Sequence, residues 1–220
     1  MKKQLFLAFG LCFFSLINFA QTKTGLIFLD KETYNSIPVA SLPTTEPSTT
    51  LKVDLSNRFP TPGFQGNIGS CVGWAASYLR AFNENWANNT SGNVFSPSFI
   101  YNQIRIGDCD GGSYITSALQ LLIDQGCAHA SEFPYTENCN IQPTPNIKNG
   151  AKQYLSQNYY RIQLSDLRMM KISLYSNFPV LIGINVDNAF KSYSGGVFKT
   201  WNDIGVGAHA MVIVGYDDEK

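Results

Sequence analysis

Apolar residues recur at helical spacing in three segments of the first half of the chain. The clearest predicted helix covers 71–87, where one face carries a row of apolar side chains: Val72, Ala75, Ala76, Leu79, Phe82 and Trp86. A second helix is predicted to begin at Pro97, with Ser96 as its N-terminal cap. A third is predicted over 115–124, before Gly126.

The pattern changes beyond Pro143. Residues 154–162 and 180–186 are rich in side chains that favour strands, 164–175 predict a short helix, and 206–216 predict a strand flanked by glycines. Helices first and strands later indicate an α+β protein with two lobes, since an alternating α/β sheet would interleave them.

The first twenty residues have the pattern of a secretory signal peptide. Lys2 and Lys3 precede an apolar stretch over 5–19, which closes on Ala20. The stretch is shorter than the roughly 20 residues that a membrane-spanning helix needs. We therefore expect a signal peptide over 1–20, a secreted or periplasmic protein, and no membrane anchor.

The next segment, 21–52, has little apolar periodicity. It contains a tract rich in proline, serine and threonine over 42–50, which is typical of an extended connection. We expect a linker or a short pro-segment here, followed by one compact domain over 53–220.

Composition narrows the class of protein. The 220 residues suffice for one domain or two small lobes, and 44% hydrophobic against 15% charged residues argues against disorder. Sixteen basic residues balance sixteen acidic ones, so the chain shows no electrostatic signature of a nucleic-acid partner. We expect a monomer that binds no nucleic acid.

Four cysteines follow the predicted signal peptide: Cys71, Cys109, Cys127 and Cys139. Secretion would allow two disulfides among them. Cys71 differs from the others because it begins the predicted helix, directly after a loop with two glycines. Free backbone N–H groups and the helix dipole at that position lower a thiol pKa, so Cys71 is a candidate nucleophile as well as a candidate structural cysteine.

A nucleophilic thiol needs a base, and the chain has two histidines. His129 ends a helical segment, whereas His209 enters the predicted strand and shares a face with Met211 and Ile213. Small neighbours at His209 leave room for a substrate. His209 is the better candidate, although taken alone it would more often be a buried core histidine.

Cys71 and His209 are 138 positions apart, within the roughly 130 to 150 residues that separate cysteine and histidine in the papain signature. The residues around both resemble the papain family of cysteine peptidases: Gln65-Gly66-Asn67-Ile68-Gly69-Ser70-Cys71-Val72-Gly73-Trp74-Ala75 and His209-Ala210-Met211-Val212-Ile213-Val214-Gly215-Tyr216. Further similar motifs follow in the family's order: Ser96-Pro97, Asp110-Gly111-Gly112, Phe133-Pro134-Tyr135, Phe178-Pro179-Val180 and Tyr193 to Phe198.

The resemblance implies a papain-like fold with the active site between the two lobes, and hydrolysis of protein or peptide substrates with no cofactor and no metal. Cys71 would attack the scissile carbonyl as a thiolate, and His209 would protonate the leaving amine. Gln65 would stabilise the negative oxygen together with the backbone N–H of Cys71. Gly111 and Gly112 would hold the substrate backbone.

Two further positions follow from the resemblance. Tyr114 would wall the adjoining pocket, and Cys109 would pair with Cys139, leaving Cys127 as a buried free thiol. A zinc site made by these three cysteines and His129 is disfavoured in an oxidising compartment.

The sequence also departs from the family. Val72 replaces the aromatic residue after the nucleophile, although Trp74 could compensate, and Ile68 stands where the family has a cysteine. The asparagine that orients the histidine is expected about 15 to 20 residues after His209, beyond Lys220. We therefore expect a fragment of a longer enzyme, with weak activity and an open sheet edge as written.

Three interpretations stay open. The first is a secreted thiol endopeptidase. The second is a papain-fold binding protein without catalysis, favoured by Val72 and by the missing asparagine. The third is an acyltransferase or transglutaminase-like enzyme that uses the same cysteine and histidine. A serine hydrolase is disfavoured because the Gly-x-Ser-x-Gly motif is absent.

Overall fold

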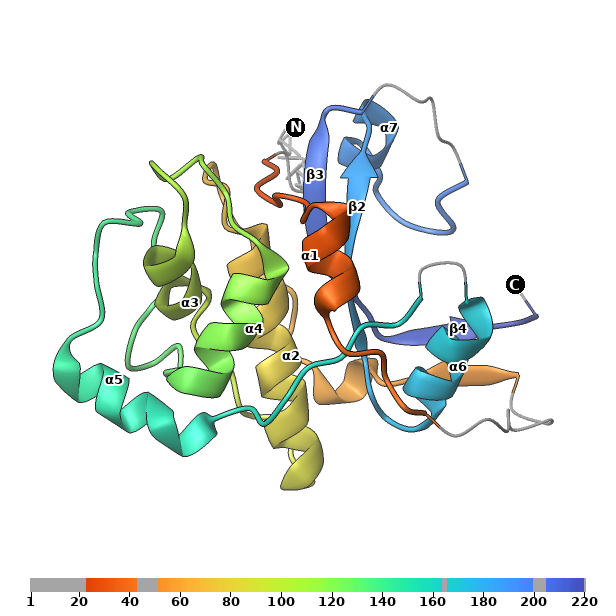
Figure 1. The fold of residues 1–220 in the computed structure, drawn as a ribbon, viewed down its shortest axis with the longest axis horizontal. Coiled ribbons are helices and arrows are strands. Elements are labelled where there is room, and N and C mark those ends of the chain that lie inside the picture. Colours follow the sequence, from red (N-terminus) through yellow and green to blue (C-terminus); the bar gives the residue numbers. More distant parts are fainter. Residues whose placement is uncertain (1–22, 43–50, 164–165, 200–204, 220) are drawn as a thin grey trace, which may run out of the picture.

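The computed structural model describes residues 23–42, 51–163, 166–199 and 205–219, and it forms two lobes (Figure 1). One lobe is helical and holds α2 (Cys71–Ala87), α3 (Pro97–Ile104), α4 (Ile115–Asp124) and α5 (Pro145–Ala151). The other combines strands with short helices: α6 (Leu167–Tyr175), β2 (Val180–Val186), α7 (Asn188–Lys191) and β3 (Gly207–Ile213). The predicted α+β class with two lobes is confirmed. The predicted signal peptide lies outside the described residues.

Helix α2 is the centre of the helical lobe. Val72, Ala76 and Phe82 of its apolar face are almost completely buried; Val72 and Ala76 belong to the core that α2 shares with α3 and α4, and Phe82 belongs to a second, smaller core. Trp86 is the exception, since it remains 44% exposed and stacks on Phe82 at 5.8 Å between ring centroids. The periodicity therefore predicted both the helix and most of its buried face.

The other two predicted helices also have the expected boundaries. Ser96 caps α3, because its hydroxyl accepts a hydrogen bond from the backbone N–H of Phe99 at 3.0 Å, and Pro97 is the first helical residue. Helix α4 covers the predicted residues and ends before Gly126, whose φ of 76° a glycine adopts at little cost.

The strand predicted over 206–216 is two strands. β3 pairs antiparallel with β2, from Val180 opposite Ile213 to Val186 opposite Gly207. β4 (Gly215–Asp217) instead pairs antiparallel with β1 (Lys52–Asp54). Val214 separates them, and its carbonyl accepts a hydrogen bond from Leu55. The chain changes partners here because each strand completes a different two-stranded sheet, which local sequence does not reveal.

The strand predicted over 154–162 is not formed. The 3-10 helix η2 (Lys152–Tyr154) replaces its start, and the following residues are irregular apart from one bridge between Arg161 and Val39. In the described part of the chain this segment belongs to neither sheet, and its backbone bonds elsewhere, as Ser156 does to Leu122. Helix α6 was predicted from 164 and begins at Leu167; residues 164–165 lie outside the described part.

The segment before the predicted domain packs onto both lobes. It holds helix α1 (Lys31–Ser36), which lies between the helical lobe and the strands (Figure 1). Leu55, the residue before η1 (Ser56–Arg58), forms a second small core with Phe82 and Leu174. In the part of the chain that the structure describes, no helix is both long and apolar enough to span a membrane.

Candidate active site

Cys71 is the first residue of α2 and is only 1% exposed. Burial raises the pKa of its thiol, while hydrogen bonds from the backbone of Ala210, Gly25 and Val72 act in the opposite direction. The sequence predicted a lowered pKa from the helix N-terminus alone. In this structure the loss of water around the sulfur outweighs the helix, because a thiolate depends strongly on solvation.

His209 lies on β3, opposite Ile184 of β2, and is 8% exposed. Burial lowers the pKa of its imidazole, since the charged form loses its hydration. Among the described residues, its Nδ1 atom has no hydrogen-bond partner. The next residue, Ala210, reaches the Cys71 thiol through its backbone, so β3 brings the predicted base to the side of the predicted nucleophile.

Gln65 is fully buried in the loop that leads to Cys71. Its side-chain nitrogen Nε2 donates one hydrogen bond to the carbonyl oxygen of Ile68 at 2.9 Å and a second to the carbonyl oxygen of Lys23 at 3.3 Å. The first bond holds the amide within its own loop. The second uses the other N–H of the amide to bind a carbonyl oxygen of a peptide.

That peptide is the chain's own N-terminal segment, Lys23–Ile27. The backbone N–H of Ile27 donates to Ser113 O at 3.0 Å, and Ser113 N–H donates to Gly25 O at 2.8 Å, which makes a parallel bridge between Leu26 and Ser113. On the opposite side, the N–H groups of Gly25 and Leu26 both lie 3.2 Å from Ala208 O. The segment therefore pairs with both lobes.

Gly25 and Leu26 fill the space beside the nucleophile. A Cβ atom on Gly25 would lie 1.9 Å from the carbonyl oxygen of Gly69, so only glycine fits. The Leu26 side chain is buried, and a Cβ atom on Gly183 of β2 would lie 2.4 Å from it. Within the segment predicted as a linker or short pro-segment, residues 25–27 thus have a defined position, held because their backbone groups find partners on both lobes.

A second contact region, remote from Cys71, holds the residues that follow this segment. Arg161 donates through Nε to Ile37 O at 3.0 Å, and its backbone bonds to Pro38 and Ala40 on both sides. The Arg161 guanidinium also lies over the ring of Tyr34 at 5.5 Å. This contact region explains the position of α1 between the lobes.

Of the predicted substrate-binding residues, Gly112 is buried and Gly111 is exposed. Both precede Ser113, whose backbone makes the bridge to Leu26. Tyr114 is half-buried and starts α4 as its N-terminal cap. Their predicted roles toward a substrate stay predictions. The sequence did not single out Ser113 or Leu26, although the short apolar run Gly25-Leu26-Ile27 was a signal that the segment is not a simple linker.

The disulfide that the resemblance implied, Cys109–Cys139, is present, and Cys127 is a buried free thiol. Burial raises the pKa of Cys127 strongly, so it stays a neutral thiol. His129, the other histidine, stacks on Phe95 at 4.6 Å and is paired with Glu132 only through its backbone. Within the described ranges, no cluster of three histidine, cysteine or acidic side chains could hold a metal ion.

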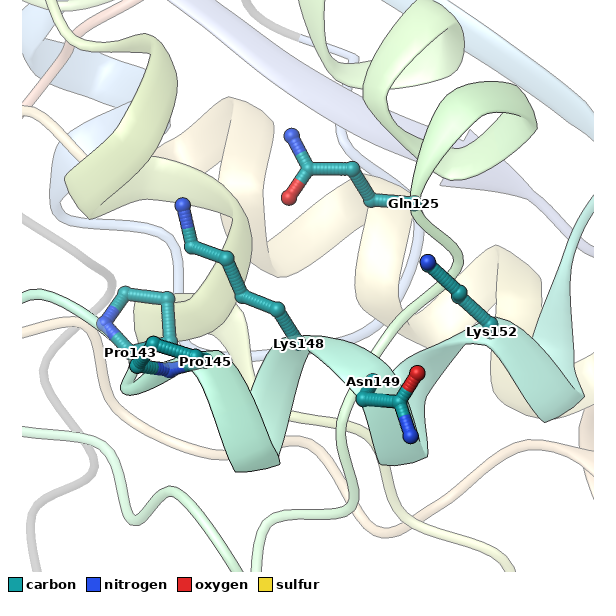
Figure 2. Close-up of a pocket in the computed structure, with 6 residues that line it drawn as sticks. All are labelled: Gln125, Pro143, Pro145, Lys148, Asn149 and Lys152. Atoms are coloured by element: carbon teal, nitrogen blue, oxygen red, sulfur yellow. The ribbon is translucent and has the colours of Figure 1, made fainter.

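A separate hollow of about 460 Å³ lies beside α5, and Figure 2 shows the residues that line it: Gln125, Pro143, Pro145, Lys148, Asn149 and Lys152. The lining has two cations but neither a nucleophile nor a base. It also includes none of the predicted site residues. The region around Cys71 is therefore the better candidate for chemistry, and the N-terminal segment packs against it between the two lobes.

The chain matches the family model of papain family cysteine proteases over residues 57–220. It belongs to that family. Cathepsin S of Mus musculus is 30% identical over 165 residues, which make up 70% of this chain and 46% of cathepsin S. The chain therefore spans about half the length of that curated relative.

Solved structures give the same fold. Xylellain, a cysteine protease from Xylella fastidiosa, has a TM-score of 0.71 and 24% identity, over 91% of this chain and 82% of xylellain. The procathepsin B S9 of Trypanosoma congolense has a TM-score of 0.66 and 16% identity, over 89% of this chain and 71% of that protein. The predicted papain-like fold is confirmed.

Proposed function

We propose that this chain carries the active site of a secreted thiol peptidase, in which Cys71, His209 and Gln65 hydrolyse peptide bonds. The observation that carries the proposal is the peptide segment in the cleft. Its Lys23 carbonyl accepts a hydrogen bond from Gln65, and its backbone pairs with Ser113 beside the predicted glycines. A cleft that already binds an extended backbone next to a thiol suits a peptide substrate.

The chemistry follows from the three side chains. His209 takes the Cys71 proton, and the sulfur attacks the carbonyl carbon of the substrate. The Gln65 amide and the Cys71 backbone N–H stabilise the negative oxygen that forms. The imidazolium of His209 then gives its proton to the leaving amine. Water, deprotonated by His209, hydrolyses the thioester and regenerates the thiol.

The N-terminal segment keeps this site in a resting state, as a short pro-segment would. It occupies the cleft, and the burial that accompanies it favours the neutral thiol of Cys71 and the neutral imidazole of His209. Neither group is then in the charged form that nucleophilic attack and protonation of the leaving amine require. Exposure of the cleft would restore water to both groups and shift them toward the ion pair.

Secretion is part of the proposal. It rests on the predicted signal peptide over 1–20 and agrees with the Cys109–Cys139 disulfide, which persists in oxidising compartments.

One experiment tests the function. The protein purified from cells that produce it naturally is treated with an epoxide inhibitor of thiol peptidases, and its intact mass and its hydrolysis of a denatured protein are measured. We expect one adduct on Cys71, absent in Cys71→Ala, and loss of hydrolysis in His209→Ala. An unlabelled Cys71 together with no hydrolysis would favour the alternative of a papain-fold binding protein. Amide transfer to an added amine in preference to water would favour an acyltransferase.

A further inference from the structure

Tyr135 connects the two ends of the loop that precedes the nucleophile. This loop, 65–70, starts at the buried Gln65 and ends at the buried Ser70. The Tyr135 hydroxyl lies 2.6 Å from Gln65 O and 2.7 Å from Ser70 Oγ. A carbonyl oxygen can only accept, so the Tyr135 hydroxyl donates to Gln65, and the Ser70 hydroxyl must donate to Tyr135.

The loop between these two ends contains the groups that would form the oxyanion hole. The Gln65 amide is oriented by the Ile68 carbonyl, and the Cys71 backbone N–H follows directly after Ser70. A change in the separation of Gln65 and Ser70 would therefore change the separation of the two donors. Oxyanion stabilisation depends on that distance, because the donors must converge on one oxygen atom.

Tyr135 is itself held on both sides along the chain. Phe133 is buried and packs edge-on against Phe99 of α3 at 6.3 Å. Thr136 donates its backbone N–H to Ser98 Oγ of α3 at 3.1 Å. Tyr135 thus projects from a segment fixed to α3, although the segment has no regular secondary structure of its own.

Two neighbours complete this support. The Tyr135 ring packs against the Trp74 ring of α2 at 4.7 Å, which orients the hydroxyl toward the loop. Glu137, two residues further on, accepts a hydrogen bond from the Asn67 backbone N–H at 2.9 Å. The same segment therefore holds the beginning, the middle and the end of the loop.

We propose that Tyr135 is a positioning residue for hydrolysis, whose hydroxyl sets the separation of the two oxyanion donors, Gln65 Nε2 and Cys71 N–H. It touches neither the substrate nor the sulfur. Its effect should therefore fall on steps that develop a negative oxygen, and it should spare steps that use only the sulfur. The proposal rests on the function proposed above.

The chain supplies a matched control in Tyr78. Tyr78 is also half-buried, also packs against Trp74, at 5.5 Å, and also donates its hydroxyl to a backbone carbonyl, that of Thr61 at 2.8 Å. Thr61 lies outside the 65–70 loop. Tyr78→Phe therefore removes an equivalent hydrogen bond without changing the loop.

The test compares the full-length protein with Tyr135→Phe, Tyr78→Phe and Ser70→Ala. Each protein is studied in three assays: peptide hydrolysis, which gives kcat and KM, inhibition by a peptide aldehyde, and alkylation of Cys71 by iodoacetamide, which gives a rate. The Cys71 sulfur adds to the carbonyl carbon of the aldehyde, and the former carbonyl oxygen then lies in the oxyanion hole. Alkylation forms a carbon–sulfur bond and releases iodide, with no such oxygen.

We expect Tyr135→Phe to lower kcat about tenfold, with KM within about twofold, and to weaken aldehyde inhibition by a similar factor. The alkylation rate should stay within about twofold, and Tyr78→Phe should match the parent in all three measurements. Ser70→Ala should change kcat and aldehyde inhibition in the same direction as Tyr135→Phe, which covers the case that Tyr135→Phe folds poorly.

The inference is wrong if Tyr135→Phe behaves as Tyr78→Phe does, or if alkylation falls as much as kcat. If the parent protein hydrolyses no peptide, the proposed function fails by itself. In that case, amide hydrogen exchange of residues 65–70, measured in both tyrosine variants, tests whether Tyr135 holds the loop. Faster exchange in Tyr135→Phe than in Tyr78→Phe supports the positioning role, and equal exchange overturns it.

Discussion

The side-chain amide of Gln65 donates a hydrogen bond to the carbonyl oxygen of Lys23, 42 positions earlier in the same chain. The group proposed to stabilise a substrate oxyanion is therefore occupied by the protein itself. Gly25, two residues after Lys23, contributes a backbone hydrogen bond to the Cys71 thiol. The N-terminal segment thus contacts two of the three proposed catalytic residues, and we predict that the proposed activity requires its displacement.

Gly25→Ala should displace the segment from the cleft. The added methyl group would lie 1.9 Å from Gly69 O, and overpacking of this kind costs about 1–3 kcal/mol. We expect the alkylation rate of Cys71 at neutral pH to rise roughly 5- to 150-fold. The control is Gly92→Ala, where a Cβ atom would meet only Thr90 Oγ1 at 3.8 Å. Equal rates in both variants would show that the segment does not limit access.

The ion pair between Lys23 and Asp110 should contribute little to this closure. Its atoms are 2.9 Å apart, but the two side chains are 41% and 56% exposed. Exposed pairs contribute about 0.2–1 kcal/mol, so Lys23→Gln should raise the alkylation rate less than about fivefold. A rise as large as that of Gly25→Ala would show that charge, and not backbone pairing, holds the segment. The dependence on salt concentration would check the same point.

His209 should make the folded state less stable as the pH falls. Burial lowers its pKa below the ordinary value of about 6.5, so the unfolded chain binds more protons than the folded one between the two pKa values. The stability from the neutral imidazole is full above about pH 6.5 and is lost as the pH falls through the folded-state pKa. Urea unfolding should show a flatter pH dependence for His209→Gln. If the two proteins lose equal stability between pH 7 and 5, other groups carry the dependence.

Loss of the Cys109–Cys139 disulfide should lower the thermal stability. The bridge closes a loop with a sequence separation of 30 residues, and the chain-entropy relation gives about 3–4 kcal/mol for that length. The variant with both cysteines changed to serine should therefore unfold roughly 10 °C lower in a calorimetric scan. A matched reference is Cys127→Ser, which alters a thiol that forms no disulfide. An unchanged Tm for the double variant would contradict the estimate.

Much of the helical lobe followed from the sequence. The apolar spacing after Cys71 predicted α2, and the Ser96-Pro97 pair predicted the start of α3, because both signals depend on local geometry. The strand prediction over 206–216 combined β3 and β4, since strand pairing is decided by residues far along the chain. The prediction over 154–162 was wrong for the same reason.

The features of the candidate site also divide into those that the sequence predicted and those that only the structure showed. The sequence by itself determined a cysteine at a helix start, a histidine on a strand and the papain family, and it predicted the catalytic roles of the two side chains, because residue type and order carry that information. Only the tertiary structure decided that Lys23–Ile27 occupies the cleft, that burial rather than the helix governs the Cys71 pKa, and that Tyr135 joins Gln65 to Ser70. These features depend on backbone groups and solvent access that arise only when distant segments meet.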